Sequence, residues 1–116
     1  MQPVFVTSGS LAADRRYERA QQYWRRGELE TAADLMRQAL ELAPDFAAGW
    51  FALGEIQDLR GEREAAIAAF RKTRDHDHDD RHGAGLHLMR YGVEPMGEMP
   101  PAYIRSLFDQ YAPEFN

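Results

Sequence analysis

The amino-acid sequence predicts an all-α protein built from repeated helical hairpins. Comparing the chain with itself gives one clear offset: Gly27 and Gly61 are 34 residues apart, and small and large residues match at the same distance around them. Apolar residues within each unit recur at helical spacing, as in a helix that buries one face. Self-similarity at a period of roughly 20 to 50 residues is typical of repeat architectures.

Two full repeats are expected, over residues 13–46 and 47–80, each a helix, a tight turn and a second helix. Gly27 and Gly61 stand where the first helix of each unit should end, since glycine tolerates the left-handed conformation that follows many helices. Arginines precede each glycine and glutamates follow it, which suits the dipoles of the flanking helices. Asp45 is expected to cap the first helix of the second unit.

The remaining segments flank these units. Residues 1–12 should form an N-terminal tail and the start of the first helix. A third helix, like the first helix of another repeat, is expected over 81–92, capped by the aspartates before it. A loop over 93–99 contains helix breakers, and a terminal helix over 100–116 follows a pair of prolines.

The 34-residue helix–turn–helix unit resembles the tetratricopeptide repeat. The resemblance is carried by residues at repeat-packing positions: Ala20, Gly27, Ala32, Pro44, Trp50, Leu53, Gly54, Gly61, Ala66 and Phe70. The small ones let paired helices approach closely, and the large ones fill the space between turns. The resemblance implies a solenoid of two full repeats, a third helix and a C-terminal capping helix.

The same resemblance implies a binding surface, because the first helix of each tetratricopeptide pair lines a concave groove that takes peptides or partner helices. The candidate groove residues are Tyr17, Gln21, Trp24, Arg25, Phe51, Glu55, Asp58 and Met89. Exposed aromatic groups of this kind are typical of contact sites. The Lys and Asn that clamp a C-terminal carboxylate in some relatives are missing, so a protein or peptide of another kind is the expected partner.

The end of the sequence resembles a second family. Residues 101–116 look like the lead-in of a class I S-adenosylmethionine-dependent methyltransferase, and the matching residues are Phe108, Asp109, Tyr111, Ala112 and Phe115. One bacterial group joins tetratricopeptide repeats to such a lead-in. The resemblance implies that this chain is the N-terminal, non-catalytic region of a longer bacterial enzyme, whose cofactor would be S-adenosylmethionine, or a shortened relative of such an enzyme.

An alternative for the terminal segment is structural. Tyr103, Ile104, Leu107, Phe108 and Tyr111 form one apolar stripe at helical spacing. Such a stripe would close the last face of the solenoid or join two copies as a homodimer. In the second case the protein is a self-association scaffold with no enzyme context.

No catalytic, cofactor or metal site is expected within the chain itself. A glycine-rich loop after a strand, which S-adenosylmethionine binding would need, is missing, and no serine has a histidine near it in sequence. Without cysteine there can be no disulfide or thiolate site. The run from Asp75 to Asp80, with histidines in and after it, has ligands that suit zinc or nickel. Its place between two units favours a solvated turn instead.

Charge and composition indicate which kinds of partner and which compartment to expect. The net charge of −5 argues against a nucleic-acid partner, which calls for a basic surface. No apolar run is long enough for a membrane span, and the N-terminus lacks the pattern of a secretory signal. A cytoplasmic protein is therefore expected, and its oligomeric state stays open.

Overall fold

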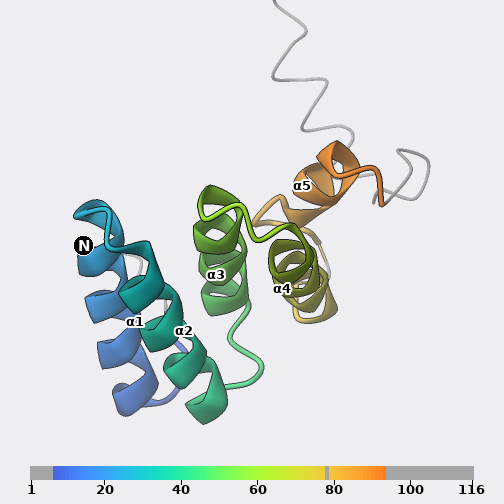
Figure 1. Cartoon of the computed structure of the whole chain (residues 1–116). Helices are drawn as coiled ribbons and strands as arrows, with labels where there is room; N and C mark the ends of the chain where they lie inside the picture. Colours follow the sequence, from blue (N-terminus) through green and yellow to red (C-terminus); the bar gives the residue numbers. More distant parts are fainter. Residues whose placement is uncertain (1–6, 78, 94–116) are drawn as a thin grey trace, which may run out of the picture.

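The structure, a computed structural model, describes residues 7–77 and 79–93, and it is helical without strands over that part of the chain. Its helices are α1 (Leu11–Arg25), α2 (Leu29–Leu42), α3 (Ala47–Leu59), α4 (Arg63–Asp75) and α5 (Ala84–Arg90). They follow one another in chain order across the molecule (Figure 1). The most extensive packing lies within the pairs α1–α2 and α3–α4, and α2–α3 and α4–α5 contacts join the pairs. The predicted all-α solenoid of helical hairpins is confirmed.

Each hairpin turns at the glycine that the repeat predicts. Gly27 has a φ of +80° and Gly61 a φ of +76°, in the left-handed region that glycine adopts at little cost. The N–H of Gly27 donates to the Trp24 carbonyl at 2.9 Å, and the next N–H donates to the Tyr23 carbonyl, also at 2.9 Å. The equivalent bonds close the second hairpin at 3.0 and 2.9 Å. The last carbonyls of α1 and α3 thus gain donors, and the chain reverses within a few residues.

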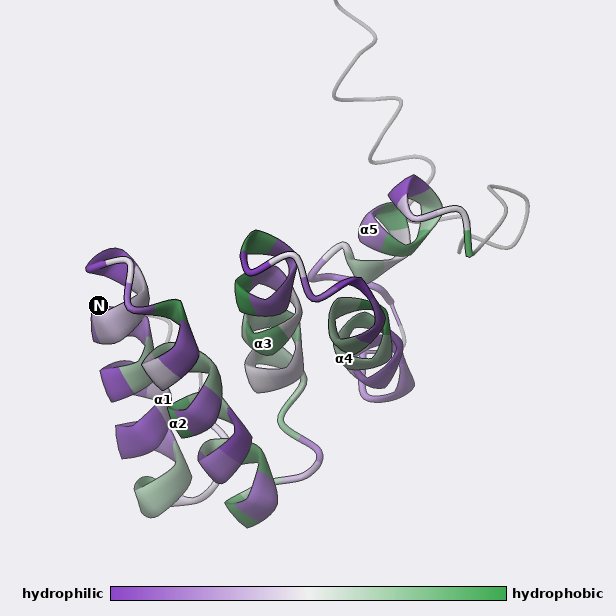
Figure 2. Ribbon diagram, viewed as in Figure 1, coloured by the Kyte–Doolittle hydropathy of each residue, from purple (hydrophilic) through white to green (hydrophobic). Residues whose placement is uncertain are grey.

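The hydrophobic core has two parts along the array. The first lies between α1, α2 and α3, where Ala20, Ala32 and Met36 are fully buried. The second joins α4 to α5 around Phe70 and Leu88, which are also fully buried. Hydrophobic residues face the neighbouring helices, and hydrophilic residues cover the outside (Figure 2). Each helix is therefore held mainly by its neighbours in the sequence.

Repeat-packing residues fall into two groups by exposure. The buried ones are Ala20, Ala32, Leu53, Gly54, Ala66 and Phe70. The turn glycines and Pro44 are exposed, and Trp50 is half-buried. The indole N–H of Trp50 donates to the Pro44 carbonyl at 2.7 Å, which ties α3 to the loop before it.

Two predicted helix starts are wrong. Asp45 does not cap α3, because the residue at the N-cap is Phe46 and no side chain caps that end. The third helix begins at Ala84 and not at Arg81. The backbone before it is interrupted by two residues with positive φ, Asp80 at 51° and Gly83 at 80°.

Asp80 does hydrogen-bond to the start of the third helix, as predicted, although that helix begins later than predicted. Its side chain is buried, and its carboxylate accepts the backbone N–H of Gly85 at 3.1 to 3.2 Å, inside the first turn of α5. Burial raises the pKa of this carboxyl, and the hydrogen bond from Gly85 opposes that rise. Most of the N-terminal tail, the end of the loop over 93–99 and the terminal helix over 100–116, with its apolar stripe and methyltransferase-like motif, lie outside the described residues.

Candidate functional site

The predicted groove residues form stripes along α1 and α3. Tyr17, Gln21 and Trp24 are spaced four and three residues apart on α1, so they share one face of that helix. The α3 residues 34 positions later, Phe51, Glu55 and Asp58, have the same spacing. All of these side chains are half-buried, whereas Arg25 at the end of α1 is exposed.

A shorter stripe continues on α5. The turn after α5 falls at Gly92, 31 residues beyond Gly61, and α5 has seven residues where α3 has 13. At that offset His82, which precedes α5, and Leu86 and Met89, which lie on it, are the equivalents of the α3 stripe. We call the three stripes together the groove face: Tyr17, Gln21, Trp24, Arg25, Phe51, Glu55, Asp58, His82, Leu86 and Met89.

Aromatic rings connect the stripes. Tyr17 packs edge-on against Phe46, with ring centroids 5.0 Å apart. Phe51 packs edge-on against Phe70 at 5.6 Å and stacks with the His82 ring at 5.7 Å. These contacts orient the rings of the groove face before any partner binds, which lowers the entropy cost of binding.

Acidic groups occupy the middle of the groove face. Burial, followed by the charge of Asp58, raises the pKa of the Glu55 carboxyl. Burial, followed by the charge of Glu55, raises the pKa of the Tyr17 hydroxyl across the gap between α1 and α3. The direction of the Glu55 shift indicates that its carboxyl lies in surroundings that hydrate negative charge poorly.

Asp58 also connects the groove face to the end of α5. Its carboxylate accepts a hydrogen bond from the Tyr91 hydroxyl. Burial and then this hydrogen bond raise the pKa of Tyr91 to about 12. Arg63 donates to the Tyr91 carbonyl at 2.8 Å and lies over its ring. No pattern in the sequence predicts these contacts, because they join residues far apart in the chain.

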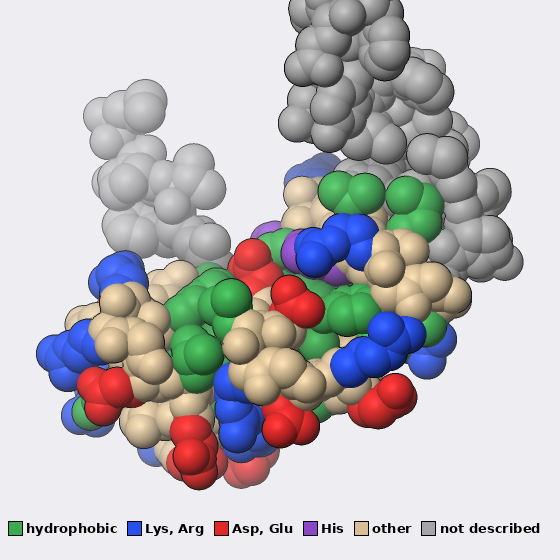
Figure 3. Space-filling view, turned by 45° about the horizontal axis from the view of Figure 1, so that its top comes forward, with side chains coloured by type: hydrophobic (Ala, Val, Ile, Leu, Met, Phe, Trp, Pro, Cys, Tyr) green, Lys and Arg blue, Asp and Glu red, His purple; other side chains and the backbone are tan. Residues whose placement is uncertain are grey.

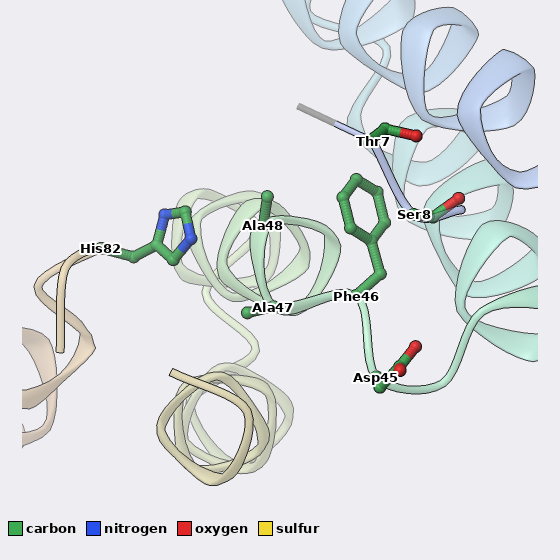
Figure 4. Close-up of a pocket in the computed structure, with 7 residues that line it drawn as sticks. All are labelled: Thr7, Ser8, Asp45, Phe46, Ala47, Ala48 and His82. Carbon is green, nitrogen blue, oxygen red and sulfur yellow. The ribbon is translucent and has the colours of Figure 1, made fainter. Parts of the chain in front are cut away.

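A pocket of about 400 Å³ opens where α3 begins (Figure 4). Its lining residues are Thr7, Ser8, Asp45, Phe46, Ala47, Ala48 and His82. Thr7, Ser8 and Phe46 lie on one side, and the His82 ring projects from the other with Ala48 between them. A second hollow of about 340 Å³ lies beside Trp24, Gln21 and Arg25 at the opposite end of α1.

Sequence reasoning missed the pocket's N-terminal wall. Ser8 precedes α1, where its hydroxyl and its backbone N–H both donate to Asp14 at 2.8 Å. These bonds stabilise the Asp14 carboxylate and lower its pKa. The spacing of Ser8, Ser10 and Asp14 signals a structured helix entry, since the Ser10 side chain caps α1.

The two histidines that follow the run from Asp75 to Asp80 pack against aromatic rings. His82 stacks with Phe51, and His87 stacks with Phe70 at 4.4 Å with the rings nearly parallel. Over residues 7–77 and 79–93, no three His, Asp or Glu side chains gather in a way that could hold a metal ion.

One face of the molecule carries a mixture of side-chain types. On the face drawn in Figure 3, hydrophobic side chains gather over the middle, acidic side chains lie among them, and histidine lies beside basic groups towards one end. A surface of this mixed kind suits another macromolecule better than a small substrate, because its hollows are open to solvent.

The helical hairpins, their glycine turns and the repeated stripes define a helical repeat protein. The family model described as Tetratricopeptide repeat matches residues 23–88, more than half of the sequence, and the chain belongs to the tetratricopeptide repeat family. It is therefore a protein–protein interaction module. None of the curated proteins matches the chain. No helix within the described ranges is long and apolar enough to cross a membrane.

Proposed function

We propose that this chain binds a protein partner by holding a peptide segment along the groove face. The observation that carries the proposal is the pair of matching stripes on α1 and α3, whose aromatic side chains are half-buried and pack at the edge of the core. Aromatic side chains at protein surfaces are the usual energetic anchors of an interface. Trp24 is the strongest candidate, because it borders an open hollow.

A selection from a random peptide library displayed on phage tests this proposal with the full chain as bait. We expect selected peptides to bind the wild type and to lose affinity for Trp24→Ala by roughly 30-fold, the effect of removing a hot spot of about 2 kcal/mol. Leu42→Ala is the matched control, since Leu42 is an exposed apolar residue of α2, outside the groove face. Circular dichroism checks that each variant keeps its helices.

Phe51→Ala gives a second readout, with some loss of stability because Phe51 packs against Phe70. If Trp24→Ala and Phe51→Ala both bind the selected peptides as well as the wild type does, the groove face is not the binding surface.

We also propose a context for this module: recruitment or orientation of substrates for a class I S-adenosylmethionine-dependent methyltransferase, in a bacterial cytoplasm. The support is the sequence motif at Phe108, Asp109, Tyr111, Ala112 and Phe115. The reading frame of the gene tests it: a strand and a glycine-rich loop encoded after Asn116 support this context, and a stop codon there contradicts it.

The competing proposal is self-association through the apolar stripe from Tyr103 to Tyr111. Light scattering distinguishes the two, because a homodimer through that stripe requires a mass that doubles with concentration. A monomer at high concentration removes this alternative.

A further inference from the structure

We propose that the groove face selects peptides in which a Lys or Arg follows or precedes a bulky apolar residue at a spacing of about three residues. The inference deepens the proposed function and rests on it. The carboxylates of Glu55 and Asp58 would take the cation, and the pocket beside Phe46 and Ala48 would take the apolar side chain.

The negative charge at the centre of the groove face is not neutralised within the described part of the chain. Neither Glu55 nor Asp58 forms an ion pair there, whereas Asp34 and Asp79 on the outer surface pair with arginines. Arg63 and Arg90 act on Tyr91, at the α5 end. Asp58 accepts a hydrogen bond from the Tyr91 hydroxyl, so Glu55 is the carboxylate that a ligand cation would compensate most.

The rings around these carboxylates also suit a cation. The charge of Glu55 acts on the Tyr17 hydroxyl, so the two side chains lie near each other. Phe51 precedes Glu55 by one helical turn. Ring faces attract Lys and Arg, and the methylene stems of both side chains pack well on aromatic surface. Because His82 already stacks with the Phe51 ring, Tyr17 is the ring that would contribute most to holding the cation.

The apolar end of the motif follows from the pocket. Phe46, Ala47 and Ala48 supply apolar wall beside the polar side chains of Thr7, Ser8, Asp45 and His82, and the cavity of about 400 Å³ has room for a Leu, Met or aromatic side chain. Ala48 and Glu55 are two helical turns apart, a rise of roughly 10 Å. An extended peptide covers that distance in about three residues, and in the polyproline II conformation residues three apart point to the same side.

The charge of the whole chain agrees with a basic partner. The net charge is −5, which attracts basic peptides at long range and repels acidic ones. The exposed Arg25 at the α1 end of the groove face sets a limit, because it disfavours a second cation there. The basic residue is thus expected at a single position.

The test compares peptides selected by three baits from one random phage library: the full wild-type chain, Glu55→Gln, and Glu64→Gln. Glu64 is an exposed residue in the first turn of α4, so it gives the same change in charge away from the groove face. We expect wild type and Glu64→Gln to enrich Lys and Arg at least threefold over the library, at one position near an apolar residue. Glu55→Gln should lose that enrichment. A selected basic peptide should bind Glu55→Gln about tenfold more weakly, and its affinity for the wild type should fall with added salt.

Each other outcome overturns the inference. Peptides that lose affinity for Trp24→Ala but show no basic enrichment, or show acidic enrichment, contradict the basic motif and leave the proposed function standing. Basic enrichment that Glu55→Gln and Glu64→Gln retain equally assigns the preference to overall charge, and contradicts the role of Glu55. A library from which the wild type selects nothing contradicts both proposals.

Discussion

Position 54 has no room for a side chain. A Cβ atom built on Gly54 would lie 2.6 Å from Cε1 of Phe70 and 2.7 to 2.8 Å from two further ring atoms. The ring cannot move away easily, because Phe70 is fully buried and stacks with His87. The missing side chain is thus what lets α3 and α4 approach closely.

Gly54→Ala should therefore destabilise the protein, although alanine favours helices by about 1 kcal/mol. The overpacking against Phe70 should lower the free energy of unfolding by about 1 to 3 kcal/mol, measured by urea denaturation followed by circular dichroism. A variant as stable as the wild type would mean that the Phe70 ring can shift to make room for the new side chain at no cost in stability.

Gly61→Ala measures the cost of backbone strain without any cost of overpacking. A Cβ atom at Gly61 meets nothing within 4 Å, but φ is +76°, so the cost is about 1 to 2 kcal/mol from the backbone alone. The two glycines are thus required for different physical reasons, and only the cost at Gly54 depends on Phe70.

At the scale of helices, α5 differs from the others. It has seven residues, too few for an isolated helix to be stable in water. Tertiary contacts must hold it: Leu88 is fully buried, His87 stacks with Phe70, and Tyr91 donates to Asp58. Conditions that weaken these contacts should release α5 before the hairpins unfold.

The pH is one such condition. Burial first, and the charge of Arg90 second, lower the pKa of His87 below its ordinary value of 6.5, against the opposing charges of Asp58 and Asp80. The unfolded chain then binds a proton at this residue more tightly than the folded protein does. The stability contributed by the neutral ring is present above about pH 6.5 and is lost as the pH falls below it.

We expect the free energy of unfolding to decrease between pH 7.5 and 5.5, and His87→Phe to flatten that dependence, because phenylalanine keeps a ring against Phe70 but cannot take up a proton. His76→Gln is the control, since His76 is exposed at the end of α4. Urea denaturation at several pH values measures the slopes. Equal slopes for His87→Phe and the wild type would rule out His87 as the titrating group.

How far the sequence predicts this fold depends on the range of the interactions. The two hairpins were predictable because glycine turns, helical periodicity and charge placement are local signals that agree with one another. The start of α5 was not, since the positive φ values of Asp80 and Gly83 interrupt the backbone before it. The N-terminus of α3 was also misjudged, because its N-cap residue is Phe46, whose ring is buried in the core.

The candidate site also has a part that the sequence predicts and a part that depends on contacts between distant segments. The stripes on α1 and α3 follow from the spacing of residues along each helix, combined with the resemblance to a known repeat. The pocket wall formed by Thr7 and Ser8, and the bond from Tyr91 to Asp58, depend on how distant segments meet. No pattern within a single helix contains that information.

At the scale of the whole molecule, the contacts follow the chain. The main helix contacts within residues 7–77 and 79–93 are α1–α2, α2–α3, α3–α4 and α4–α5. The buried residues form two clusters, with Met36 in the first and Phe70 in the second. In such an array, stability is approximately a sum of neighbour terms, so substitutions in different clusters should act independently.

Two double-mutant cycles test this organisation with Phe70→Leu in both. Combined with Met36→Ala, in the other cluster, the two losses of stability should add to within about 0.5 kcal/mol. Combined with Gly54→Ala, they should not, because leucine lacks the ring atoms that the new Cβ would strike. The second double variant should be more stable than the sum predicts, by about 0.5 to 3 kcal/mol. Strong coupling between Met36 and Phe70 would mean that the clusters form a single cooperative core, and additivity between Gly54 and Phe70 would mean that their close approach does not limit packing.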